Sequence, residues 1–323
     1  MRFFPFLLRR LVYALLIVWG VVTLTFIILH AAPGDPASIY IRPDIAPEIV
    51  QSIRHQLGLG KPVYLQYLDW LRQWLSGNLG VSFTHNRPVA EVLVETIPNT
   101  LRLTVVVFIV QAIGGMLLGV FLAFKHHTFW DAFLDKLLLF FYSLPGFWLA
   151  LIAILIFSLK LGWLPSSHSG SMFLTENDTW HLFLDRCKHL ILPTLILSIP
   201  FIAYTARFVR GNLIDVLQQD YLRTAIAYGL PKRQMFFKYA LRNALLPLAT
   251  LTGLYLPFLL GGAVVIEYIF SWNGMGRLTI NAILSHDYPV ILATFLISAV
   301  SVVIGNLLSD ILYALVDPRV NIN

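Results

Sequence analysis

The sequence has little charge for its length. Charged side chains make up 12% of its 323 residues, and apolar side chains make up 58%. A soluble globular domain carries roughly 25% charged and about 45–50% apolar residues. With so few charges, a chain of this size cannot cover its core with the polar surface that water requires. The composition therefore predicts a protein whose solvent is largely lipid.

Cysteine and catalytic motifs are also scarce. Cys187 is the only cysteine, which excludes a disulfide or a multi-cysteine metal site within one chain. The sequence contains no P-loop, no His-Glu-x-x-His zinc motif and no Gly-x-Ser-x-Gly motif. His126-His127 and the other histidines lack the spacing of metal ligands. We therefore expect no catalytic, cofactor-binding or metal-binding residues, and no enzymatic activity in this chain.

Six apolar runs are long enough to cross the roughly 30 Å hydrocarbon core of a bilayer as helices. They are Leu11–Leu29, Leu103–Phe124, Leu137–Phe157, Leu190–Ala206, Leu245–Ile266 and Val290–Leu308. The first run is longer than the apolar region of a secretory signal, so we expect a retained span, with a cleaved signal as the alternative. The sequence predicts an all-α polytopic membrane protein with six transmembrane helices.

Basic residues gather at the amino terminus and in two connections, 125–136 and 207–244. In the second of these connections the only acidic residues are Asp215 and Asp220. Cytoplasmic loops carry an excess of Lys and Arg, and six spans place all three basic regions on one side. We therefore predict that both termini are cytoplasmic, and we attribute the net charge of +6 to topology rather than to a nucleic-acid partner.

The six apolar runs contain no Asp, Glu, Lys, Arg or His. Gln111 is the only strongly polar amide well inside a run, while Arg102, Arg207 and Glu267 fall at the ends. An ion-coupled transporter needs titratable groups within its spans. We therefore expect a partner to supply the energy for transport. An ion-coupled secondary transporter or channel subunit is the alternative, and a structural subunit or sensor is a third possibility.

Helix breakers and small residues mark several spans. Prolines interrupt the third, fourth and fifth runs, which predicts either a pathway lined by kinked helices or simple adjustment of helix tilt. Gly115 and Gly119 form a small-xxx-small pair that predicts close helix packing. In the first connection, Pro47–Leu57 and Pro62–Leu75 read as amphipathic helices suited to a membrane interface.

The fourth connection predicts a helix-turn-helix. Asp215–Tyr228 reads as a short helix, Gly229 can end it in the left-handed conformation, and Pro231 suits the start of a second helix through Lys232–Leu245. The second helix continues into the fifth span, and the small side chains of Ala225 and Ala227 would let a partner approach. A basic loop that only obeys the positive-inside rule is the alternative.

Several motifs in this sequence resemble one family. Tyr221-Leu222-Arg223-Thr224-Ala225-Ile226-Ala227-Tyr228-Gly229-Leu230, followed by Leu241-Arg242-Asn243-Ala244-Leu245-Leu246-Pro247, is similar to the coupling-loop signature of binding-protein-dependent ABC permeases, closest to the dipeptide, oligopeptide and nickel branch. Six further motifs resemble the same branch. They are His30-Ala31-Ala32-Pro33-Gly34-Asp35-Pro36, Leu57-Gly58-Leu59 with Gln66-Tyr67, Ile97-Pro98-Asn99-Thr100-Leu101, Ser143-Leu144-Pro145-Gly146-Phe147-Trp148, Glu267-Tyr268-Ile269-Phe270-Ser271-Trp272 with Gly274-Met275-Gly276, and Asp317-Pro318-Arg319. The motifs cover nearly the whole chain in the expected order.

The resemblance implies a type I ABC importer permease fold in the inner membrane. Its expected organisation is a first transmembrane helix at 1–30, a periplasmic segment with interfacial helices at 31–97, a five-helix core at 98–316 that includes a cytoplasmic coupling loop at 207–245, and a tail at 317–323. Expected partners are a second permease, two ATPase subunits that hold ATP and Mg, and an external solute-binding protein. The long outward loop resembles the first permease of such a pair.

Residue roles also follow from the resemblance. The residues expected to couple this chain to an ATPase are Arg223, Thr224, Ala225, Ala227, Gly229, Leu230 and Pro231. This chain departs from the branch at Thr224, where Glu is usual, at Ile226 and Tyr228, where basic residues are common, and at Asn273, where Pro is usual. The identity of the ATPase partner is therefore not carried over.

The substrate and the residues that line the pathway are left open by the sequence. Peptides, nickel chelates, glutathione and antimicrobial peptides all fit this branch. Peptides are preferred because most of its members carry them, and the few scattered histidines do not favour nickel.

Overall fold

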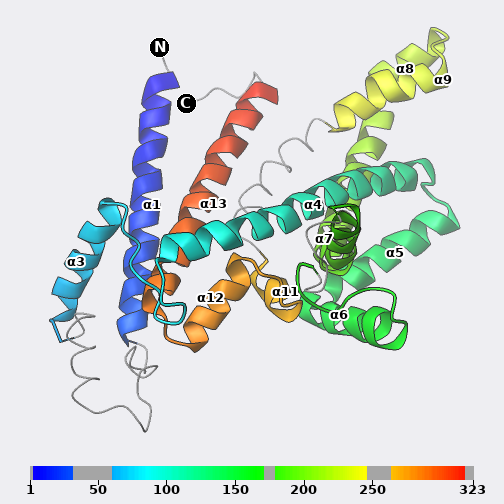
Figure 1. Cartoon of the computed structure of the whole chain (residues 1–323). Coiled ribbons are helices and arrows are strands. Elements are labelled where there is room, and N and C mark those ends of the chain that lie inside the picture. Colours follow the sequence, from blue (N-terminus) through cyan, green and yellow to red (C-terminus); the bar gives the residue numbers. More distant parts are fainter. Residues whose placement is uncertain (1–2, 32–59, 171–178, 246–262, 317–323) are drawn as a thin grey trace.

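The computed structural model describes residues 3–31, 60–170, 179–245 and 263–316, and these form helices joined by short connections (Figure 1). Two predictions, the helix at Pro47–Leu57 and nearly all of the fifth span, lie outside the described residues. Within the described ranges, the only β-pairing is an isolated bridge between Val81 and Pro88. The helices are α1 (Phe3–Ala31), α3 (Val63–Leu75), α4 (Val89–Phe124), α5 (Phe129–Ser143), α6 (Gly146–Ala153), the π-helix η2 (Ile154–Lys160), α7 (Thr179–Leu217), α8 (Asp220–Ala227), α9 (Lys232–Gln234), the π-helix η3 (Met235–Ala240), α11 (Val264–Ile269), α12 (Met275–Leu284) and α13 (Tyr288–Val316).

Four of the described helices, α1, α4, α7 and α13, are long and apolar enough to cross a membrane. The bent pair formed by α5 with α6 and η2 makes a fifth candidate if it is counted as one span. The described residues are thus helical, and they include four of the predicted spans, or five if the bent pair is one span. The count of six stays a prediction.

Two helices extend well beyond their apolar runs. α4 begins at Val89 rather than Leu103 and contains Pro98, and α7 begins at Thr179 rather than Leu190. Consequently Arg102 and Arg207 lie inside helices rather than at helix ends. The apolar run indicates which part of a helix suits hydrocarbon, whereas the helix itself continues as far as packing and backbone bonding allow.

The third predicted span is sharply bent at Leu144-Pro145. α5 ends at Ser143, α6 begins at Gly146, and the two halves meet at an angle of 99°. Leu144 adopts an extended backbone with φ −82° and ψ 139°. This follows from proline chemistry, because the proline ring disfavours the helical region for the residue before it. The predicted break at Pro145-Gly146 is confirmed.

α4 packs along α7 over most of its length, and two glycines permit the close approach. A Cβ atom on Gly115 would lie 2.6 Å from Thr205 Cβ, and one on Gly119 would lie 2.6 Å from the carbonyl oxygen of Ala206. Neither position has room for a methyl group, so the predicted small-xxx-small packing is confirmed. Gln111 is buried on α4, and the hydroxyl of Ser198 on α7 faces the carbonyl of Val107 at 3.5 Å.

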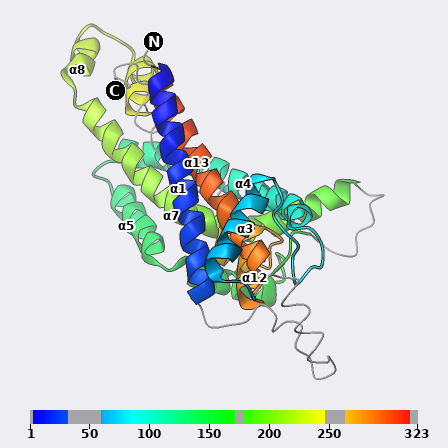
Figure 2. The same cartoon turned by 90° about the vertical axis from the view of Figure 1, so that its left-hand side faces the viewer.

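A second group of helices packs α1 against α13, with α3 lying alongside (Figures 1 and 2). Val18 and Val22 of α1 form a buried cluster with Leu296 and Ala299 of α13, and the partly buried rings of Trp70 and Trp74 cover it. The predicted amphipathic helix at Pro62–Leu75 is confirmed as α3. In both views the first turn of α1, the last turns of α13 and the α8 segment lie at the same end of the molecule, and α12 lies at the other.

Candidate functional site

Residues 220–234 form a tight helix-turn-helix at one end of the molecule, which we call the elbow. Its first helix, α8, begins at Asp220 rather than Asp215, because α7 continues through Asp215 to Leu217. The predicted start of this helix was therefore wrong. The turn at Gly229 and a second helix from Lys232 are seen, while the predicted continuation into the fifth span lies outside the described residues. α9, η3 and the helical residues 241–245 follow the turn and lead toward the fifth predicted span.

The turn of the elbow is a complete Schellman motif. The Gly229 N–H donates to the carbonyl of Ile226 at 2.9 Å, and the Leu230 N–H donates to the carbonyl of Ala225 at 3.1 Å. Gly229 has φ +81°, the left-handed conformation that this motif requires and that glycine adopts without a Cβ penalty. The Met235 N–H then donates to the Pro231 carbonyl at 3.0 Å, which starts the second helix.

A buried apolar cluster holds the elbow against the ends of α4 and α7. Leu222 is buried together with Ala123 of α4, Leu213 of α7 and Phe236 of η3. The rings of Phe124 and Phe236 lie 4.2 Å apart between centroids. The Asn243 amide also donates to the hydroxyl of Tyr221 at 2.9 Å. The elbow is therefore packed as part of the body of the molecule, and displacement of one of these elements would disturb the others.

The outer surface of the elbow is open. Tyr228 is 88% exposed, and Ile226 is 49% exposed. The structure brings all seven predicted coupling residues into this one element: Arg223, Thr224, Ala227, Gly229 and Pro231 are exposed, and Ala225 and Leu230 are half-buried.

Two ion pairs connect α5 to α7 beside the elbow. Arg210 donates from Nε to Asp131 Oδ1 and from Nη2 to Asp131 Oδ2, both at 2.7 Å, and the Asp131 side chain is only 6% exposed. Arg207 Nε lies 3.1 Å from Asp135 Oδ1. From the sequence alone, these arginines were interpreted only as topology signals. The spacing of three to four residues on both helices, Arg207 with Arg210 and Asp131 with Asp135, was the signal that could have revealed them.

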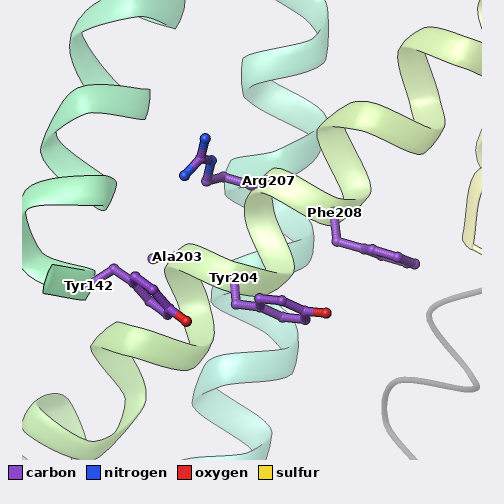
Figure 3. A pocket seen from close by; sticks show the side chains of 5 residues that line it. All are labelled: Tyr142, Ala203, Tyr204, Arg207 and Phe208. Atoms are coloured by element: carbon purple, nitrogen blue, oxygen red, sulfur yellow. The ribbon is translucent and has the colours of Figure 1, made fainter.

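A cavity of about 350 Å³ lies between α5 and α7 near these pairs. Figure 3 shows Tyr142 at the end of α5, with Ala203, Tyr204, Arg207 and Phe208 on successive turns of α7. Among the described residues, three aromatic rings and one guanidinium group therefore line it. None of these lining residues was predicted, because a cavity between helices distant in sequence has no local motif that would reveal it.

Two matches with known families together span almost the entire chain. The family described as "Binding-protein-dependent transport system inner membrane component" matches residues 115–322. Its amino-terminal companion, "Binding-prot-dependent transport system membrane comp, N-term", matches residues 3–104. The chain belongs to the binding-protein-dependent transport permeases. It is therefore a multi-pass protein of the inner membrane, and the resemblance found in the sequence motifs is confirmed.

Relatives of this permease align over nearly their whole length. The chain is 40% identical over 316 residues to the oligopeptide transport system permease protein AppB of Bacillus subtilis, covering 98% of each protein. It is 38% identical over 329 residues to the di/tripeptide transport system permease protein DppB of Pseudomonas aeruginosa, again covering 98% of each. A putative peptide permease protein of Brucella suis is 38% identical over 318 residues.

The permease also contains a buried polar network at the end opposite the elbow. It joins Asn99 and Thr100 of α4 to the segment between α11 and α12, and its centre is the carboxylate of Glu267, which has 0% exposure. Both segments belong to motifs that carried the family resemblance. No local pattern indicates that the two segments touch, because they are about 170 residues apart and share no periodicity.

Proposed function

We propose that this permease is one half of the membrane pathway of an ATP-driven ABC importer for di- and oligopeptides. The names of the relatives support peptides as the substrate class, since AppB is an oligopeptide permease and DppB a di/tripeptide permease. The partners in this proposal are a second permease of the same family, two ATPase subunits that carry ATP and Mg, and an external solute-binding protein. The chain corresponds to the first permease of the pair.

The observation that carries the proposal is the elbow. Its Schellman turn presents small and exposed residues, while Leu222 and Phe236 connect it to α4 and α7 through a packed cluster. A force applied to the exposed face therefore reaches two candidate spans directly. In the proposed cycle, nucleotide-driven movement of an ATPase pushes the elbow and tilts these helices, which closes the pathway on one side before it opens on the other.

The proposed orientation of the permease in the membrane follows from the position of the elbow. The first turn of α1 and the last turns of α13 lie at the elbow end in both views (Figures 1 and 2). An elbow that contacts cytoplasmic ATPases requires both termini to be cytoplasmic and α12 to face outward. The excess of Lys and Arg in the segments at this end supports that orientation.

The cavity between α5 and α7 is the proposed contact surface for the substrate. Its tyrosine and phenylalanine rings offer apolar faces that accept varied peptide side chains, and each Tyr also offers a hydroxyl. The Arg207 side chain is 47% exposed, and its guanidinium group, paired with Asp135, lies beside them. We expect Tyr204→Ala to weaken uptake of a radiolabelled tripeptide while leaving the amount of assembled complex unchanged.

The experiment that tests the function starts with purification of the permease together with the products of its neighbouring genes. We expect two ATPases and a second permease to co-purify, and uptake of a radiolabelled tripeptide into vesicles to require ATP and the solute-binding protein. Uptake driven by an ion gradient without ATP would instead establish an ion-coupled transporter. Ala227→Trp adds bulk to the exposed face of the elbow and should abolish ATP-driven uptake, whereas Ala227→Ser at the same position should retain it.

A further inference from the structure

A set of hydrogen bonds ties the α11–α12 turn to α4 at the outer end. The Thr100 hydroxyl donates to Glu267 Oε1 at 2.9 Å and accepts from the Met275 N–H at 2.8 Å. Glu267 Oε2 accepts from the Gly276 N–H at 2.7 Å. One threonine oxygen on α4 is thus shared by two groups of the turn. We call this set of contacts, together with those in the next paragraph, the outer latch.

Trp272 and Asn99 complete the outer latch. The Trp272 Nε1–H donates to the Asn99 carbonyl at 2.9 Å, and the Asn99 amide donates to the Asn273 carbonyl at the same distance. The Trp272 ring is buried against Leu103 and Val107 of α4. Side chain and backbone of the turn are therefore both fixed to one stretch of α4, directly after Pro98.

The turn is packed tightly against both α4 and α11. A Cβ atom on Gly274 would lie 2.5 Å from Thr100 Oγ1 and would also collide with the Glu267 carboxylate. A Cβ atom on Gly276 would lie 2.5 Å from the backbone Cα of Val264. Glu267 is completely buried, so a broken hydrogen bond would leave its oxygen without solvent to replace the lost donor. These contacts favour movement of the turn and α4 as one body.

The far end of α12 is tied down in a similar way. Asp287, which is 1% exposed, accepts from the Ser82 hydroxyl at 2.6 Å and from the Thr84 N–H at 3.0 Å through Oδ2. Ser82 and Thr84 lie in the short segment that leads into α4. Between the two ties, Leu278 and Ala282 of α12 pack against Val89 and Val92 of α4. α12 is thus clamped along the outer part of α4.

α4 reaches from the outer latch to the elbow. Thr100 contacts the latch, and Ala123 and Phe124 contact the elbow cluster. At 1.5 Å per residue, the helix between these contacts spans roughly 35 Å. In the structure, α4 is one continuous helix from Val89 to Phe124. A displacement at one end is therefore transmitted along a hydrogen-bonded rod rather than absorbed in a loop.

We propose that Glu267 and Thr100 are positioning residues for transport: they lock α11 and α12 to α4, so that the outer segment moves whenever the elbow displaces the other end of α4. This inference rests on the proposed coupling function of the elbow. In this proposal the outer latch connects the movement of α4 to that of α11 and α12, and its residues need not touch the substrate.

Hydrogen exchange of the purified complex, with and without trapping by MgATP and vanadate, tests this inference. In wild type we expect trapping to change exchange both at residues 220–230 and at residues 267–277. Thr100→Val removes the shared hydroxyl from Met275 and Glu267, and it should abolish the response at 267–277 while the elbow still responds. Thr100→Ser keeps the hydroxyl and should restore the response.

Thr96→Val is the matched control. The Thr96 hydroxyl lies one turn earlier on α4 and bonds carbonyls of its own helix, Val92 and Leu93. This variant should respond like wild type at both segments. If Thr100→Val does not yield assembled complex, Trp272→Phe removes only the bond to the Asn99 carbonyl and should weaken the response at 267–277.

The possible failures are distinguishable. An unchanged response at 267–277 in Thr100→Val or in Trp272→Phe would overturn the positioning role, and so would the absence of that response in wild type. A wild-type elbow that does not respond to nucleotide would instead contradict the proposed coupling function itself.

Discussion

Gly229 is the residue of the elbow with the strictest requirement on backbone conformation. Its φ of +81° lies in the left-handed region, which costs other L-residues about 1–2 kcal/mol. Nothing lies within 4 Å of a Cβ placed on it, so the cost of a substitution is conformational rather than steric. We expect Gly229→Ala to lower the midpoint of thermal unfolding of the complex. Gly229→Asn should lower it less, because Asn tolerates this conformation. Equal effects would contradict the reason given.

Glu267 gives a residue-scale prediction of pH dependence. Burial raises the pKa of its carboxyl above the ordinary value, although hydrogen bonds from Thr100 and the Gly276 backbone lower it in part. Between the ordinary and the raised pKa, the folded state holds a proton that the unfolded state has released. The contribution of the Glu267 carboxyl to stability is therefore present at lower pH and is lost as pH rises through this window.

The measurement compares wild type with Glu267→Gln, whose side chain does not titrate. As pH rises from the ordinary carboxyl value toward neutrality, the thermal midpoint of wild type should fall relative to that of Glu267→Gln. Because other titrating groups are common to both proteins, they cancel in the difference. A difference that grows in favour of wild type as pH rises would contradict the direction of the pKa shift.

At the scale of elements, the contact between α4 and α7 depends on glycine. Gly119→Ala would place a methyl group 2.6 Å from a backbone carbonyl of α7, and overpacking of this kind costs about 1–3 kcal/mol. We expect a lower thermal midpoint and less assembled complex. Gly211→Ala on α7 is the control, because nothing lies within 4 Å of its added methyl group and alanine favours the helix. It should match or exceed wild-type stability.

Sequence patterns predicted the helices better than their ends. Apolar runs gave the positions of α1, α4, α7 and α13, and Pro145 gave the break after α5, because burial in lipid and proline geometry are local properties. The start of α4 at Val89 and the continuation of α7 through Asp215 were missed. These ends depend on packing against α12 and on contacts beside the elbow, which no single window of sequence contains.

The parts of the candidate site that depend on local sequence were predicted, and those that depend on packing between helices were not. The elbow was predicted almost completely, because Gly229 and Pro231 impose their turn within a few residues. The Arg210–Asp131 pair, the α5–α7 cavity and the outer latch were not assigned. In each of these the partners come from different helices, and their contact is decided by how the helices pack rather than by the residues themselves.

At the scale of the whole molecule, the two ends should face opposite sides of the membrane. The test uses a Cys187→Ser background, which removes the only native cysteine, with Gln219→Cys directly before the elbow or Leu284→Cys at the end of α12. A membrane-impermeant maleimide added to spheroplasts should label the α12 cysteine, and it should label the elbow cysteine only after permeabilisation. The reverse pattern would contradict the proposed orientation.

The positive φ of Gly229 has a further consequence, which concerns handedness. A residue of mirror-image configuration prefers positive φ, and Gly229 has φ +81°. A semisynthetic protein with D-alanine at 229 should therefore keep the turn, and would stiffen it, since D-alanine has fewer unfolded conformations to lose than glycine. At this position the backbone conformation suits a D-residue better than the corresponding L-residue.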